Sequence, residues 1–166
     1  MSRARRILIT GGIALAVWGM AYGTWYAIFA EHQALENIGA SLSAAFSSAA
    51  QRDAVQSMAA LSRYKEFKYV YDRQVDVHGH WIGLAMVLIV LGLCFDQVSF
   101  SEKLKTWLAV GILAGAVLFP LGVLLQVFSQ GPLPEILAIL GAALEIAALC
   151  FVALGFARSQ SSISQS

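Results

Sequence analysis

Histidine and acidic residues recur at helical spacing in two separate stretches of the sequence. His32 and Glu36 are four residues apart, as are Asp76 and His80, and residues at this spacing share one face of an α-helix. Imidazole nitrogens and carboxylate oxygens are ligands for first-row metals such as copper, zinc and iron. His78 adds a third imidazole, and two of the histidines could instead hold a haem iron axially. The pattern predicts a metal or haem site, provided that the fold brings both stretches together.

The alternative interpretation of these residues is that they form a solvated rim. Polar side chains are common at the ends of membrane-spanning helices, and these would then pair with Arg73, Lys68 or lipid phosphate. The sequence has no HExxH or CxxCH motif. Asp76–Trp81 (DVHGHW) loosely resembles histidine-bearing helices of membrane respiratory and copper oxygenase proteins, over too short a length to transfer the role of any residue.

Two further polar residues belong to apolar runs. Glu145 falls near the middle of the last run, where an ionised carboxylate costs roughly 2.5 kcal/mol or more on insertion scales. We expect Glu145 to be neutral, paired or hydrated, either as a structural group or as a contact for a proton, a quinone or a partner. Gln126 approaches the level of the histidines from a neighbouring run.

The elements that must position these residues are long and apolar. Hydrophobic residues make up 58% of the 166 residues and charged residues 13%, whereas soluble domains are roughly half apolar and a quarter charged. Four runs reach the about 20 residues that a helix needs to cross a bilayer, without the alternation of a β-barrel strand. The sequence predicts an all-α integral membrane protein, a four-transmembrane-helix bundle with spans at about residues 7–29, 77–95, 107–128 and 136–157.

The connection over residues 30–76 is too long to be an ordinary unstructured loop. Apolar residues recur every three or four positions in its first half, which indicates that the first helix continues straight out of the membrane. Asp53 followed by Gln56 has the form of a capping box and indicates a returning helix. We therefore expect an extracytoplasmic helical hairpin, which would bring His32 to the same depth as His78 and His80.

Basic residues near the membrane ends give the orientation. Six of them lie on one side after four crossings, and the positive-inside rule then places both termini in the cytoplasm, as in a multi-pass protein of a bacterial inner membrane. They are Arg3, Arg5, Arg6, Lys103, Lys105 and Arg158. The serine-rich residues 159–166 are expected to form a disordered tail.

Glycines spaced by four residues allow helices to approach closely. Three such pairs occur, and each either packs inside the bundle or forms a face for a partner subunit. They are Gly19 with Gly23, Gly79 with Gly83, and Gly111 with Gly115.

These features are compatible with three functions, and an enzymatic role stays open. The first is a small accessory subunit of a larger respiratory or oxygenase-type membrane complex, with or without a metal or haem at its outer face. The second is a stand-alone redox protein that binds copper or haem and exchanges electrons with a quinone. A channel or transporter comes third, because a single mid-membrane acid makes a poor pathway. We expect lipid and other subunits or further copies of the chain as partners, and the net charge of +1 gives no reason to expect nucleic acid.

Overall fold

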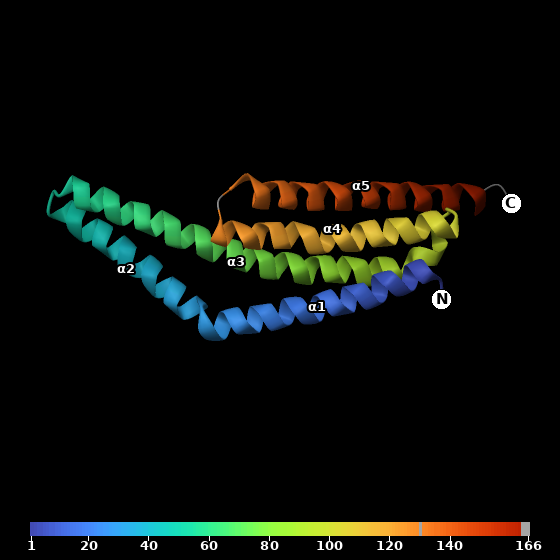
Figure 1. The fold of residues 1–166 in the computed structure, drawn as a ribbon, viewed down its shortest axis with the longest axis horizontal. Helices are drawn as coiled ribbons and strands as arrows, with labels where there is room; N and C mark the ends of the chain where they lie inside the picture. The colour runs from blue at the N-terminus through green and yellow to red at the C-terminus, as the bar shows by residue number, and fades with distance from the viewer. Residues whose placement is uncertain (130, 164–166) are drawn as a thin grey trace.

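Five α-helices and one short 3-10 turn account for nearly all of the chain in the computed structural model, which describes residues 1–129 and 131–163. No strand occurs among these residues, so the prediction of an all-helical protein is confirmed. In chain order (Figure 1) the elements are α1 Arg3–Phe29, α2 Glu31–Ala50, α3 Ala54–Cys94, η1 Phe95–Gln97, α4 Glu102–Phe128 and α5 Pro132–Ile163.

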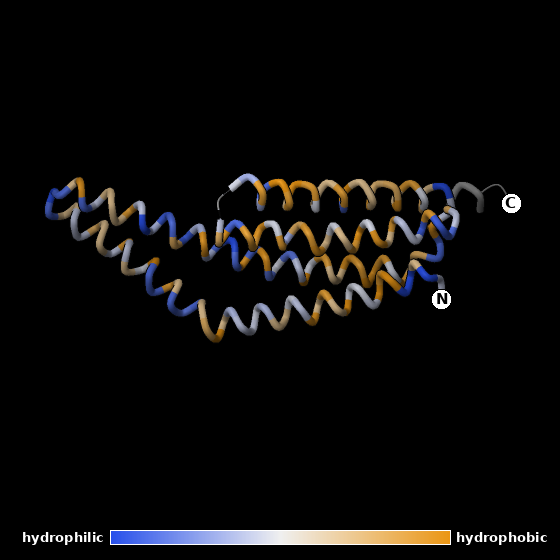
Figure 2. The backbone as a smooth tube through the Cα atoms, in the orientation of Figure 1, coloured by the Kyte–Doolittle hydropathy of each residue, from blue (hydrophilic) through white to orange (hydrophobic). Residues whose placement is uncertain are grey.

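Four of the helices, α1, α3, α4 and α5, are long and apolar enough to cross a membrane. Figure 2 shows that hydrophobic residues dominate where these helices lie side by side, whereas hydrophilic residues gather at the two ends and along the α2–α3 hairpin. Many large apolar side chains on these helices face outward, including Ile139, Ile146 and Phe151 of α5. Long helices with an apolar exterior are what a membrane protein requires.

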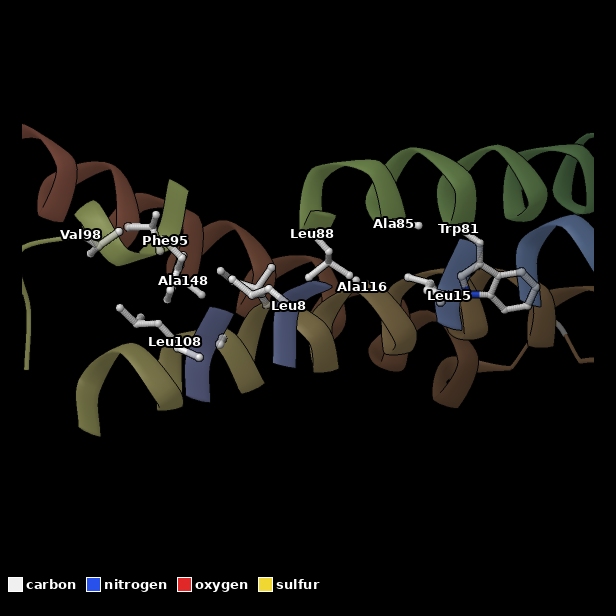
Figure 3. Close-up of a cluster of buried hydrophobic side chains, with 14 of the residues drawn as sticks. Leu8, Leu15, Trp81, Ala85, Leu88, Phe95, Val98, Leu108, Ala116 and Ala148 are labelled. Carbon is white, nitrogen blue, oxygen red and sulfur yellow. The ribbon is translucent and has the colours of Figure 1, made fainter. Parts of the chain in front are cut away.

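The helices differ in how many neighbours they contact. α1, α3 and α4 each pack against the other two, and α5 packs mainly against α4. The core side chains lie in a row between α1, α3 and α4, with Trp81 at one end and Val98 at the other (Figure 3). Near Val98 the Ser99 N–H donates to the carbonyl of Gly155, 3.2 Å away, which ties the end of α5 to the η1 region. α5 therefore forms an edge of the structure.

Small residues let α4 and α5 approach closely. The buried positions of α5 recur every three or four residues, which is the spacing of a coiled-coil seam. A Cβ atom on Gly115 would lie 2.7 Å from the Glu145 Cβ and 2.8 Å from the Gly141 carbonyl oxygen, so no larger residue fits there. The buried residues of α5 are Pro134, Ala138, Gly141, Glu145, Ala148, Val152 and Gly155.

The chain bends where α1 meets α2, although we expected one straight helix. The break lies at Ala30, whose φ of −123° departs from helical geometry. Its N–H still donates to the Tyr26 carbonyl at 2.9 Å, and its own carbonyl accepts from Ala34 at 3.0 Å. The bend therefore costs little backbone hydrogen bonding, and it turns the α1–α2 corner away from α3 (Figure 1).

The turn between α2 and α3 is closed by local contacts. The N–H of Arg52 donates to Ala49 at 2.9 Å and that of Asp53 to Ser48 at 2.9 Å, the two bonds of a Schellman motif. Arg52 has a φ of 60°, the left-handed conformation that this motif requires. The Asp53 carboxylate then accepts from the N–H of Gln56 at 3.0 Å, so the predicted cap of the returning helix is confirmed.

α2 and the first half of α3 pack on each other as an antiparallel pair. Ser41 and Ala45 are the buried residues of α2, and the Ser57 hydroxyl of α3 donates to the Ala45 carbonyl at 3.1 Å. At the other end of the chain, α5 extends to Ile163, into the segment for which we expected disorder. Residues 164–166 lie outside the described part of the chain.

Both termini lie at one end of the molecule, opposite the tip of the α2–α3 hairpin (Figure 1). Asp96 joins three elements at this end, just beyond the predicted second span. Its carboxylate accepts from the Ser2 hydroxyl at 2.5 Å and lies 3.2 Å from the Arg5 guanidinium, while its carbonyl accepts from Lys105 at 3.3 Å. The hydrogen bonds from Ser2 and Arg5 lower the pKa of the Asp96 carboxyl.

Candidate functional site

His32 lies on the exposed surface of α2. Its side chain is 88% exposed, and its Nε2 lies 3.1 Å from the Glu36 carboxylate one turn further on. The predicted pair of residues four apart therefore forms, but it faces water. A contact between two side chains this exposed contributes little to stability.

His78 packs against α1. Its Nδ1 lies 2.9 Å from the carbonyl oxygen of Gly19, and its ring fills the space beside Gly23. A Cβ atom on Gly23 would collide with the imidazole, so this glycine is what admits the ring. The pair of small residues on α1 thus serves to seat a histidine of α3.

His80 points toward α4 instead. Its ring stands edge-on to Phe119, with the ring centroids 4.7 Å apart, and its Nδ1 lies 2.6 Å from the carbonyl oxygen of Asp76. The carboxylate of Asp76 lies 3.8 Å from Arg73, so it pairs with a cation of its own helix. This pairing is the one that the solvated-rim interpretation names.

The five predicted ligands therefore do not converge. α3 is continuous through this region, and two residues along a helix turn the side chain by about 200°, so His78 and His80 face different neighbours. His78 lies beside Gly19 and Gly23 of α1, nine or more residues before His32, and the His32 side chain is exposed. Among the described residues, no group of three or more His, Cys, Asp or Glu side chains could hold a metal ion.

The two predicted intramembrane polar residues have different surroundings. Gln126 of α4 accepts a hydrogen bond from the Tyr69 hydroxyl of α3 at 3.4 Å, near the end of α4 that is closer to the hairpin. Glu145 is only 5% exposed in the α4–α5 seam, and its Oε1 has no hydrogen-bond partner among the described residues. Gly115 lies against the Glu145 Cβ, where an added Cβ atom would come within 2.7 Å.

The three glycine pairs also separate into two kinds. Gly19 and Gly23 face α3. Gly115 lies very close to α5, and Gly111, one turn away, is in ordinary contact with the same helix. Gly79 and Gly83 are different: nothing in the described residues lies within 4 Å of where their Cβ atoms would be. The spacing of this pair can be read from the sequence. The packing shows in addition that none of the described helices lies against it.

Apolar side chains are also exposed on the hairpin, outside the predicted spans. Leu35 is 48% and Phe46 69% exposed, and their separation by eleven residues places them on one face of α2. Val55 and Met58 are exposed at the start of α3, 81% and 66%. Leu35 and Phe46 belong to the apolar periodicity of residues 30–50, yet the buried residues of α2 are the smaller Ser41 and Ala45.

The arrangement defines the structural class of the protein but not a reaction that it carries out. It is an all-helical chain with four helices suited to a membrane and a helical hairpin beyond one end of them. No family model matches the sequence, and neither a curated protein nor a solved structure shows a significant match to the chain.

Proposed function

We propose that this protein is a small accessory subunit of a larger membrane complex, with both termini in the cytoplasm and the α2–α3 hairpin outside. The observation that supports this function is the uncovered pair Gly79 and Gly83, within the predicted second span. A glycine in a helix costs roughly 0.8–1.0 kcal/mol relative to alanine in soluble hosts, so a position exposed to lipid gains nothing from it. Close contact with another helix gives the glycines a role.

The face around these glycines fits a transmembrane helix of another protein. Val75, Met86 and Val90 lie within about 40° of Gly79 around the α3 axis and are all exposed. Large apolar side chains that flank a glycine pair form the ridges and the groove into which a second helix packs. The other glycine pairs serve this purpose within the chain.

The hairpin supports a partner that extends beyond the membrane. α2 has 20 residues, so it reaches about 30 Å from the bend at Ala30. Its exposed Leu35 and Phe46, together with Val55 and Met58 at the tip, present apolar surface where lipid tails do not cover it. Exposed apolar patches of this kind mark protein interaction sites.

Replacing the glycine pair tests the proposal. The tagged Gly79→Leu, Gly83→Leu variant should fold but lose the chains that co-purify with the wild type in mild detergent, because leucine side chains fill the groove. The matched control is Ala143→Leu, Ala147→Leu, a pair with the same spacing on the exposed face of α5. It should retain those chains. Equal recovery of the same chains by both variants, or a wild type that purifies alone, would refute the accessory role.

A second copy of this chain is the competing occupant of the face. Gly83→Cys, in a background where Cys94 and Cys150 are alanine, reports on it directly. We expect no disulfide-linked homodimer in native membranes after mild oxidation. A homodimer formed through residue 83 would assign the face to self-association and overturn the proposal.

A further inference from the structure

The basic residues at the end of the molecule that holds the termini are not equivalent. Arg5 pairs with Asp96, and Lys105 lies 3.2 Å from Glu102 and also donates to the Asp96 carbonyl. Arg3 and Lys103, in contrast, form no ion pair or hydrogen bond through their side chains with the described residues. Arg6 also has no such partner, so uncompensated cations remain at the surface, and two of them, Arg3 and Lys103, lie close together.

Both of these cations line one hollow of about 500 Å³ between α1 and α4. Arg3 comes from the first turn of α1 and Lys103 from the first turn of α4. The remaining lining residues all belong to α4: Glu102, Thr106, Trp107 and Val110.

We propose that this hollow binds the phosphate headgroup of an anionic membrane lipid. The lining changes from charged to apolar along α4, because Trp107 lies about 6 Å and Val110 about 10 Å further along the helix axis than Lys103. A phosphate at Arg3 and Lys103 would leave the glycerol beside Trp107 and an acyl chain on Val110. Basic pockets between transmembrane helices at the cytoplasmic side suit anionic lipid headgroups.

The other polar groups of the hollow agree with an anion. The hollow adjoins the N-terminus of a 27-residue helix, whose exposed N–H groups favour negative charge. Glu102 opposes it, but its carboxylate is compensated by Lys105. The Thr106 hydroxyl donates to the Glu102 carbonyl at 2.8 Å, so it is already satisfied and competes for nothing. Because Arg3 and Lys103 have no partners among the described residues, the net charge of the hollow is positive.

A lipid fits the hollow better than free phosphate, because two of its six lining side chains, Trp107 and Val110, are apolar and exposed. Free phosphate would leave this surface unused. Binding of a lipid headgroup and binding of free phosphate can therefore be distinguished by experiment. The site does not depend on the partner proposed above, since none of its residues belongs to the Gly79 face or the hairpin.

Native mass spectrometry of the full-length chain in mild detergent tests the site. Phosphatidylglycerol and phosphatidylcholine with the same acyl chains are titrated separately, and the ratio of their dissociation constants is measured. Each Lys or Arg near anionic lipid contributes about 1 kcal/mol, so Arg3→Gln or Lys103→Gln should each reduce the preference for phosphatidylglycerol about fivefold, and both together roughly thirtyfold.

Arg6→Gln is the matched control, because Arg6 is an exposed basic residue of the same helix end that does not line the hollow. It should change the preference less than twofold. An equal loss in the Arg6 variant would show that only general surface charge attracts the lipid and would overturn the proposal, as would a wild type without preference. Inorganic phosphate that binds as tightly as phosphatidylglycerol would reject the lipid as ligand. Retained circular dichroism confirms that each variant folds.

Discussion

The α4–α5 seam makes a sharp prediction, because two glycines one turn apart on the same face of α4 meet different amounts of space. A Cβ atom on Gly115 would lie 2.7–2.9 Å from the Glu145 Cβ, the Gly141 carbonyl oxygen and the Glu145 nitrogen. A Cβ atom on Gly111 would lie 3.8 Å from Ala148 and Leu144, which is ordinary contact. The same methyl group should therefore destabilise at one position and not at the other.

The expected change in the free energy of unfolding is the balance of two effects, the helix propensity gained and the overpacking introduced. Glycine to alanine favours a helix by up to about 1 kcal/mol in soluble hosts. At Gly115 two of the three close atoms belong to the backbone of α5, so the helices must move apart, and overpacking of this kind costs about 1–3 kcal/mol. We expect Gly115→Ala to lower the free energy of unfolding by about 1–2 kcal/mol and Gly111→Ala to leave it unchanged or raise it by up to about 1 kcal/mol.

Equilibrium unfolding in mixed micelles, followed by circular dichroism, measures both variants under the same conditions. Gly115→Ser should destabilise at least as much as Gly115→Ala, since its Cβ meets the same atoms and its hydroxyl adds volume. Equal stability of Gly115→Ala and Gly111→Ala would contradict both the close approach of α4 and α5 at Gly115 and the inference that a narrow seam holds α5 in place.

Three further predictions concern single residues. Arg52→Gly should raise stability by about 1 kcal/mol in thermal unfolding, because glycine adopts the left-handed conformation without the Cβ penalty, whereas Arg63→Gly, within α3, should lower it by a similar amount. Glu145→Gln should leave stability and the recovery of co-purifying chains unchanged, because the amide keeps the shape of a side chain whose Oε1 has no partner among the described residues, and loss of those chains would instead favour a charged or proton-carrying role. His32→Ala should leave metal content by elemental analysis, and the optical spectrum, identical to those of the wild type, because the contact of His32 with Glu36 faces solvent; a loss of bound metal would instead support the metal site expected from the sequence.

Local patterns in the sequence predicted the elements well because their causes are local. Asp53 and Ser101 cap α3 and α4 with their own side chains, and each accepts from the N–H three residues on. The four long apolar runs likewise became the four helices suited to a membrane, since length and composition suffice for that inference. The return of α3 from the hairpin follows from the same cap.

Which side chains are buried and which are exposed was harder to predict, because this depends on which helix lies opposite. Leu35 and Phe46 have the periodicity of a packed face, yet they are exposed, since α2 meets α3 through smaller residues that allow closer approach. The metal site required His32 to lie at the same depth as His78 and His80. His78 instead lies beside Gly19 and Gly23 of α1, nine or more residues before His32, and this register depends on which side chains meet between the two helices rather than on a local pattern.

The continuity of α3 links the two surfaces proposed for the partner. Met58 near the tip and Gly79 within the predicted span belong to one unbroken helix and are about 30 Å apart along its axis. A partner that contacts both surfaces would bind them at a fixed separation, so the second contact forms without a further loss of translational freedom. Neither surface then needs to be strong alone. This explains why the uncovered groove can be as small as two glycines and the apolar surface of the hairpin as sparse as four exposed side chains: Leu35, Phe46, Val55 and Met58.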